Sequence, residues 1–285
     1  MQDPQAFGWQ AEMELPSPRM EAKQQEAGTR ISFHHVLEYQ GRLDKFPAFI
    51  ESVIEARRPA TVWEIGAGAN PALTREFVET HGIDYTALDA EASEMDKAEY
   101  KPKLVARDIC NANDLPESVA DLVFSRMACE HFCDGAAAHR NVCRILKPGG
   151  IAVHCFPTMY ALPFMLNRLV SERFSRFLLN LFLPRDYYHH DKFPARYELC
   201  RGPIPSQIKT LEELGFEVCE YRAFFGHRYY LNGHLKPLHW LEERKTRMLL
   251  KSPNPYLTAY ATVILRKRAP EANGERPGKP VSAAA

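Results

Sequence analysis

The residues best suited to chemistry follow a short apolar run at 61–65. Gly66 ends that run, and Gly68 stands two residues later, shortly before Pro71. Glycines let a backbone approach a ligand closely, and a helix that begins after such a turn offers free N–H groups. This stretch therefore predicts a cofactor site above the end of a buried strand. A tight strand-to-helix turn that binds nothing is the simpler alternative.

Polar residues also stand where the neighbouring strands are expected to end. Asp89 lies about 20 residues after Gly68, a spacing at which an acid accepts hydrogen bonds from ribose hydroxyls. Asp108 closes a third strand, and Ser125 with Arg126 closes a fourth. Any one of these is explained by a strand that runs into a polar loop. The set together predicts a site along one edge of a sheet.

Strand-like and helix-like segments alternate along most of the chain. The expected strands are 61–65, 84–89, 103–108, 120–125, 151–156, 216–222 and 256–265, and the expected helices are 46–54, 71–80, 136–146 and 206–214. Such alternation is typical of a parallel sheet with helices on both faces. We expect an α/β, Rossmann-like, mostly parallel sheet of seven strands, with an N-terminal helical cap and an inserted lid.

The expected domain organisation is one catalytic unit with polar ends. Residues 1–30 are rich in Pro and Gln and predict a disordered or loosely docked arm, and 269–285 predict a disordered tail. The domain then spans 31–268. Its segments 157–204 and 225–250 break the rhythm with aromatic and basic residues and are expected to form the lid that binds an acceptor.

The composition indicates which partners the protein binds and in which cellular compartment it works. Lys plus Arg and Asp plus Glu are both 36, so the net charge is zero and nucleic acid is not an expected partner. The seven cysteines form no CxxC pair, which favours reduced thiols in the cytoplasm. No signal-peptide core and no apolar run of about eighteen residues is present, so no membrane span is expected.

The sequence from Glu64 to Gly68 resembles the first motif of the class I S-adenosylmethionine (SAM)-dependent methyltransferases. The stretch 121–131 resembles the motif on their fourth strand, and 144–150 the turn before their fifth. The resemblance covers about 58–157 and the final helix and strands. It implies SAM as the cofactor. The residues it assigns to cofactor binding are Glu64, Gly66, Ala67, Gly68, Asn70, Asp89, Ala90, Asp108, Ile109, Ser125 and Arg126.

Within that resemblance, Asp89 is expected to bind the ribose hydroxyls. Asp108 is expected to meet the adenine amino group, with Ile109 packed on the ring. Glu64 either holds the loop or meets the ammonium group of the cofactor. The family often has a further glycine where this chain has Asn70, which changes the loop without removing the site.

His131 is the expected general base. It follows the fourth strand, where the methyl group should point, and histidine titrates near neutral pH. The alternative is that Glu130 and His131 only fix the loop by hydrogen bonds. Some relatives bind a metal through Glu-x-x-Glu-His, but here the first position is Met127, so no metal is expected.

The acceptor is expected to be a small molecule bound by the two aromatic and basic segments. The residues predicted to line its site are Tyr160, Tyr187, Tyr188, His190, Arg196, Tyr197, His227 and Tyr229. A hydroxyl oxygen of a sugar or specialised metabolite is favoured because of His131, and a nitrogen or carbon acceptor is the alternative. The amphipathic stretch 162–183 is expected to be a lid or the face of a homodimer rather than a membrane contact.

Two other classes of protein stay open at this point. A nicotinamide-dependent oxidoreductase would need a third glycine where the chain has Pro71. A SAM-binding protein without catalysis would keep the same cofactor residues. Binding of NAD would separate the first from a methyltransferase, and turnover of an acceptor would separate the second.

Overall fold

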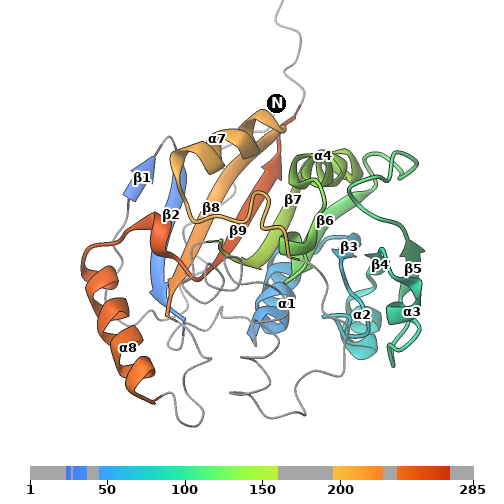
Figure 1. The fold of residues 1–285 in the computed structure, drawn as a ribbon. Helices are drawn as coiled ribbons and strands as arrows, with labels where there is room; N and C mark the ends of the chain where they lie inside the picture. The colour runs from blue at the N-terminus through green and yellow to red at the C-terminus, as the bar shows by residue number, and fades with distance from the viewer. Residues whose placement is uncertain (1–23, 27, 37–44, 160–194, 227–235, 270–285) are drawn as a thin grey trace, which may run out of the picture.

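A computed structural model describes residues 24–26, 28–36, 45–159, 195–226 and 236–269, and these form one α/β fold (Figure 1). Its strands are β1 (Gln24–Glu26), β2 (Thr29–His35), β3 (Thr61–Ile65), β4 (Asp84–Asp89), β5 (Lys103–Ala106), β6 (Ala120–Arg126), β7 (Leu146–Pro157), β8 (Phe216–Phe225) and β9 (Tyr260–Lys267). Its helices are α1 (Phe46–Arg57), α2 (Arg75–His81), α3 (Ala92–Met95), α4 (Gly135–Ile145), α7 (Pro205–Glu213) and α8 (Lys236–Lys251), with short 3-10 turns η3 (Cys129–His131) and η6 (Pro255–Leu257).

The described strands build one mixed sheet in the order β1-β2-β8-β9-β7-β6-β3-β4-β5. The strands β3 to β7 run parallel to their neighbours, whereas β9 is antiparallel to both β7 and β8. The predicted fold class is thereby confirmed. The chain leaves β3 toward β4 on one side and later returns to β6 on the other. The carboxyl end of β3 is therefore a topological switch point, where open α/β sheets bind ligands.

The N-terminal part of the described chain differs from the sequence prediction. Residues 24–26 and 29–35, expected in a loose arm and a helical cap, form two strands at the sheet edge, so the sheet has nine described strands rather than seven. Ile31 and Phe33 on β2 are both 3% exposed, and β2 runs parallel to β8. Their spacing of two residues is the period of a strand with one buried face. A helix does follow, as α1.

The two faces of the sheet carry separate cores. The helices α1 and α2 cover one face, where Phe46 and Ile50 pack with Val62 and Phe124. The helices α4 and α7 cover the other, where Val142 belongs to the same cluster as other apolar residues of β3 and β6. Because side chains alternate along a strand, each residue at a strand end is directed toward one of these two layers.

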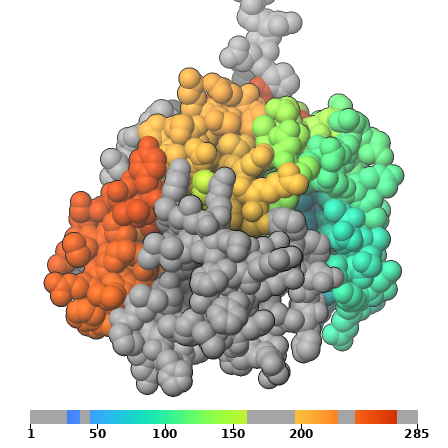
Figure 2. Space-filling view, viewed as in Figure 1, coloured from blue at the N-terminus to red at the C-terminus, as the bar shows by residue number. Residues whose placement is uncertain are grey.

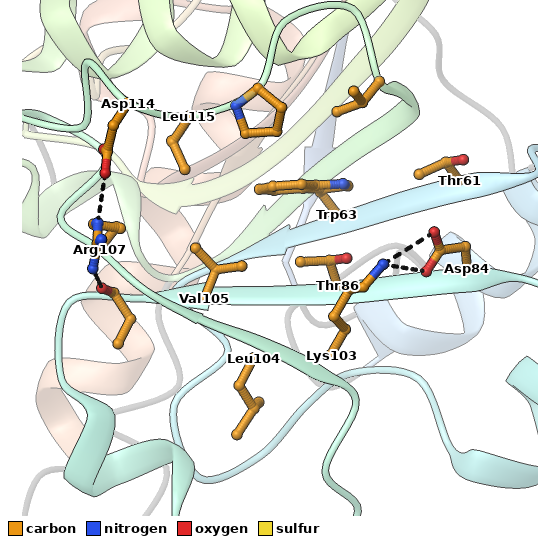
Figure 3. A pocket seen from close by; sticks show the side chains of 13 residues that line it. Thr61, Trp63, Asp84, Thr86, Lys103, Leu104, Val105, Arg107, Asp114 and Leu115 are labelled. Atoms are coloured by element: carbon orange, nitrogen blue, oxygen red, sulfur yellow. Dashed lines mark hydrogen bonds and ion pairs between the residues drawn. The ribbon is translucent and has the colours of Figure 1, made fainter.

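A surface hollow lies on the sheet face at β3, β4 and β5 (Figure 3). Trp63 and Thr86 line it, together with the ion pairs that join Asp84 to Lys103 and Arg107 to Asp114. The chain between β5 and β6 forms no helix here, so only loop residues lie over this part of the α4–α7 face. None of the expected cofactor residues lines the hollow, and we do not place the cofactor there.

Candidate cofactor and methyl-transfer site

The turn after β3 depends on the absence of a side chain at Gly66. Its φ is +73°, a left-handed conformation that favours glycine, and its N–H donates to the carbonyl of Leu88 at 2.8 Å. A Cβ added there would lie 2.4 Å from the Cβ of Ala128, well inside van der Waals contact. Gly66 therefore lets the segment after β6 pack directly against the glycine turn.

Asp89, at the end of β4, holds the second half of the same turn. Its Oδ2 accepts a hydrogen bond from the N–H of Gly68 at 2.8 Å, and its Oδ1 accepts one from the N–H of Glu91 at 2.9 Å. A carboxylate has about four acceptor sites, so two hydrogen bonds leave room for hydroxyl donors. The carboxylate is half-buried and sits beside the turn, as the sequence predicts for a ribose-binding acid.

Glu64 is directed into the α1–α2 layer and holds the loop. It is 2% exposed, accepts a hydrogen bond from the Tyr85 hydroxyl, and accepts one from the N–H of Ala72 at 3.0 Å. Burial raises the pKa of Glu64 to about 7, because the charged form loses its water. Of the two roles considered for Glu64, these contacts favour the structural one. The helix after the turn begins only at α2, later than expected, where Thr74 caps it.

Asp108 heads a small polar cluster after β5. Its carboxylate accepts hydrogen bonds from the N–H of Cys110 at 2.9 Å and from Nδ2 of Asn111 at 2.8 Å. Ile109 beside it is 3% exposed and belongs to the α4-side core. Asp108, Cys110 and Cys133 have ligand atoms within 4.8 Å of one another, close enough to hold a metal ion. Burial raises the pKa of Cys110 to about 12, which keeps that thiol protonated and disfavours a metal.

Ser125, at the end of β6, is directed away from the turn and into the α4 layer. It is fully buried, and its hydroxyl lies 2.8 Å from Nδ1 of His154 and 3.2 Å from Sγ of Cys129. The ring of His154 packs edge-on against that of His139 on α4. Burial lowers the pKa of both histidines, so this group is a neutral hydrogen-bonded part of the core.

The remaining expected cofactor residues lie around the same turn. Nη2 of Arg126 donates to the carbonyl of Asn70 at 3.3 Å, which joins the end of β6 to the loop after Gly68. Ala67 is buried, whereas Ala90 is exposed after β4. The structure thus brings residues from the ends of β3, β4 and β6 together, while Glu64 and Ser125 face opposite layers of the fold.

The turn η3 presents His131 above the edge of the sheet. The backbone reaches it through Met127, whose φ is +54° and whose N–H donates to the carbonyl of Cys155 at 2.8 Å. His131 is 37% exposed at its side chain, and its Nε2 lies 3.9 Å from Oε1 of Glu130. The imidazole of His131 is therefore partly accessible after the end of the fourth parallel strand.

Glu130 was considered from the sequence as loop support and as part of a metal motif, but not as a buried carboxyl. Its side chain is 4% exposed, and Oε2 has no hydrogen-bond partner among the residues that the structure describes. Burial raises its pKa to about 8, since an unpaired carboxylate is costly away from water. Ala128 was missed as well, because only the three-dimensional contact with Gly66 gives it meaning.

Two of the residues predicted to bind the acceptor lie within the described chain. The N–H groups of Arg196 and Tyr197 both donate to the carbonyl of Glu130, at 2.7 and 3.1 Å, which places them next to η3. The others lie outside the described residues: Tyr160, Tyr187, Tyr188, His190, His227 and Tyr229. The stretch 162–183 also lies outside them.

Comparison with known proteins agrees with this geometry. Residues 63–154 match a family model described as a methyltransferase domain, and the match spans the glycine turn, Asp89, Asp108 and η3. This part of the chain is a SAM-dependent methyltransferase domain, and SAM is its cofactor. A search of curated proteins found no match.

Solved structures resemble the chain at low sequence identity. One is a protein of Galdieria sulphuraria, provisionally described as a sarcosine dimethylglycine methyltransferase: identity is 14%, coverage is 79% of this chain and 85% of that one, and the TM-score is 0.49. The cyclase SpnF has 15% identity, coverage of 80% and 83%, and a TM-score of 0.48. A SAM-dependent methyltransferase of Archaeoglobus fulgidus has 16% identity, coverage of 80% and 97%, and a TM-score of 0.46.

The contact between Gly66 and Ala128 gives the first prediction. Gly66→Ala should abolish measurable SAM binding and destabilise the fold, because the new methyl group overlaps Ala128. Gly149→Ala is the matched control: Gly149 has φ +77°, but a Cβ there meets nothing within 4 Å. It should cost only the left-handed strain, about 1–2 kcal/mol, and keep the affinity. Calorimetric titration with SAM and urea unfolding measure both effects, and unchanged affinity in Gly66→Ala would contradict this account.

The buried carboxyl of Glu130 gives a prediction about pH. Its pKa is about 8 in the fold against an ordinary 4.5, so the native state binds the proton more tightly than the unfolded chain. The free energy of unfolding should therefore fall as pH rises from about 4.5 to about 8. The raised pKa of Glu64 also lowers the free energy of unfolding as pH rises, but its contribution is complete at about pH 7.

Glu130→Gln should remove the part of this pH-dependent loss of stability that is due to Glu130, on the order of a few kcal/mol. The difference from the parent should be clearest between pH 7 and 8. Urea unfolding across the pH range measures it. The exposed Glu76→Gln on α2 is the control and should leave the slope as in the parent protein. If Glu130→Gln keeps the parental slope, the carboxyl is not the proton-binding group described.

Proposed function

We propose that the protein transfers a methyl group from SAM to a small-molecule acceptor, with a hydroxyl oxygen as the methylated atom. The observation that carries the proposal is the glycine turn at the switch point of the sheet, closed by Asp89. A glycine turn that a ligand can approach closely, with a carboxylate at the end of the next strand, suits a ligand that has ribose hydroxyls.

The residues present fit the chemistry of the cofactor. Asp89 keeps acceptor capacity for two hydroxyls, and Asp108, just after the neighbouring strand β5, is a second acceptor that suits an amino group. The sulfonium of SAM supplies an already activated methyl group, so the chain has mainly to position the acceptor and take up its proton.

His131 is the group proposed to take up that proton. When the hydroxyl oxygen bonds to the methyl carbon, the carbon–sulfur bond breaks and its electron pair stays on sulfur. The hydroxyl proton passes to the imidazole. Oε1 of Glu130 lies 3.9 Å from Nε2 of His131, so a positive charge formed on the imidazole would favour ionisation of this buried carboxyl. The backbone N–H groups of Arg196 and Tyr197 are hydrogen-bonded to the carbonyl of Glu130. The last residues of the predicted lid segment 157–204 therefore lie next to η3.

A nitrogen or carbon acceptor is the second candidate. A neutral amine needs little help from a base, so it would leave His131 with a binding role. The exposed position of His131, with the buried carboxyl of Glu130 beside it, favours the oxygen acceptor.

The cofactor assignment is tested by substitution at the two ends of one strand. Asp89→Ala should lower the affinity for SAM and S-adenosylhomocysteine at least tenfold in a calorimetric titration, because it removes an acceptor for the ribose hydroxyls and the anchor of Gly68. Asp84→Ala, at the opposite end of β4, is the control and should bind as the parent does. Binding of NAD instead of SAM would overturn the proposal.

The role of His131 is tested by turnover with a hydroxylated acceptor found by screening. His131→Ala should lower kcat about 10²–10⁴-fold and leave the SAM affinity unchanged, the usual loss when a general base is removed. His81→Ala, on the exposed end of α2, should keep the parental rate. A nearly unchanged kcat in His131→Ala would point to the nitrogen or carbon alternative.

A further inference from the structure

The helix α8 exposes an unusual strip of side chains. Trp240 is 60% exposed, Leu241 54% and Met248 65%. Helical spacing of 3.6 residues per turn places these three on one side of α8, opposite the buried Thr246 and Leu249. Figure 2 shows α8 in orange along the outer left rim of the molecule.

Cations share this strip with the apolar side chains. Arg244, Arg247 and Lys251 are exposed and fall on the same third of the helix circumference. Arg244 lies over the Trp240 ring, 5.8 Å from its centroid. We call these six residues the α8 strip: Trp240, Leu241, Arg244, Arg247, Met248 and Lys251.

The acids of α8 lie outside the strip. Glu242 is 8% exposed and pairs with Lys245. Glu243 is 21% exposed at its side chain and lies 3.1 Å from Nε2 of His35 on β2, and 4.0 Å from Arg247. The strip therefore carries three cations and no carboxylate of its own, on an otherwise neutral chain.

Exposed large apolar side chains are concentrated in this region. Six are found among the described residues, and five of them lie on α8 or on η6, which follows α8 after three residues. The two on η6 are Tyr256, 50% exposed, and Leu257, 43% exposed. Clustering of this kind marks an interaction surface, whereas single exposed apolar residues need no explanation.

We propose that the α8 strip binds the surface of an anionic membrane. Tryptophan, leucine and methionine on one helix side can enter the boundary between headgroups and acyl chains, while arginine and lysine meet lipid phosphates. The charge decides between the candidate partners, because a second copy of this chain would bring the same three cations against one another. None of the described helices is long and apolar enough to cross a membrane, so the contact is peripheral.

The test is sedimentation of the full chain with large unilamellar vesicles. The protein should pellet with vesicles of phosphatidylcholine and phosphatidylglycerol and stay in solution with phosphatidylcholine alone. Added salt should release it, since screening weakens surface charge contacts. The Trp240 fluorescence should shift to shorter wavelength on binding, and Trp240→Phe should remove that shift.

Variants separate the contributions of charge and apolar contact. Each cation near an anionic bilayer strengthens binding about fivefold, so the combined Arg244→Gln, Arg247→Gln and Lys251→Gln variant should bind about a hundredfold more weakly. Trp240→Ser with Met248→Ser should also lose binding. The control replaces three exposed cations elsewhere, Arg140, Lys209 and Arg268, by Gln and should bind like the parent. All variants should keep the parental SAM affinity.

Three results would overturn the proposal. The first is absence of binding to anionic vesicles, and the second is equal loss in the strip and control variants. The third is a parent protein that elutes as a dimer and becomes monomeric on Trp240→Ser with Met248→Ser. That result would assign the strip to an interface between two copies.

Discussion

The whole candidate site depends on one close approach between backbone segments, that of Gly66 to Ala128. It brings the loop after β6 against the turn after β3, so that one strand end supplies the cofactor turn and the next supplies His131. The carbonyl of Leu88, bonded to Gly66, fixes β4 to the same point, and the carbonyl of Cys155, bonded to Met127, adds β7. Four strand ends are held in register by contacts that involve almost no side chains. The side chains near these four strand ends are therefore available for binding and catalysis.

The alternation of side chains across the sheet then divides the polar residues into two groups. Glu64 faces one helical layer and is hydrogen-bonded to Tyr85 and Ala72, whereas Ser125 faces the other and is hydrogen-bonded to His154. These bonds fix the ends of β3 and β6. Asp89 is the last residue of β4 and Asp108 follows β5, and at both places a half-buried carboxylate accepts backbone N–H groups and keeps acceptor capacity. Position relative to the end of the strand thus decides whether an acid supports the site or stays available to a ligand.

Much of this could be predicted from the sequence, because β3, β4 and β6 are largely apolar runs that end in, or run into, glycine or polar residues. The fold class and the cofactor edge follow from that pattern. Strand β2 was missed because Ile31 and Phe33 are a short alternation whose partner, β8, lies far along the chain. The buried carboxyl of Glu130 could not be predicted either, since its isolation results from packing of segments distant in sequence. Ser125 was expected to face the cofactor because the sequence shows that it lies at the end of a strand. The sequence does not show which layer its side chain faces.

The pairing of β2 with β8 also constrains how the chain reaches its native state. Arg30 and Glu220, joined at 2.5 Å, are 190 residues apart, so the edge of the sheet closes only after β8 has been synthesised. Until then only β1 pairs with β2, and the edge of β2 that joins β8 has no partner strand. Non-local pairing of this kind slows folding and leaves unpaired strand edges open to association. Strand β2 is thus synthesised long before the strand that fixes it, and its pairing depends on the later part of the sheet.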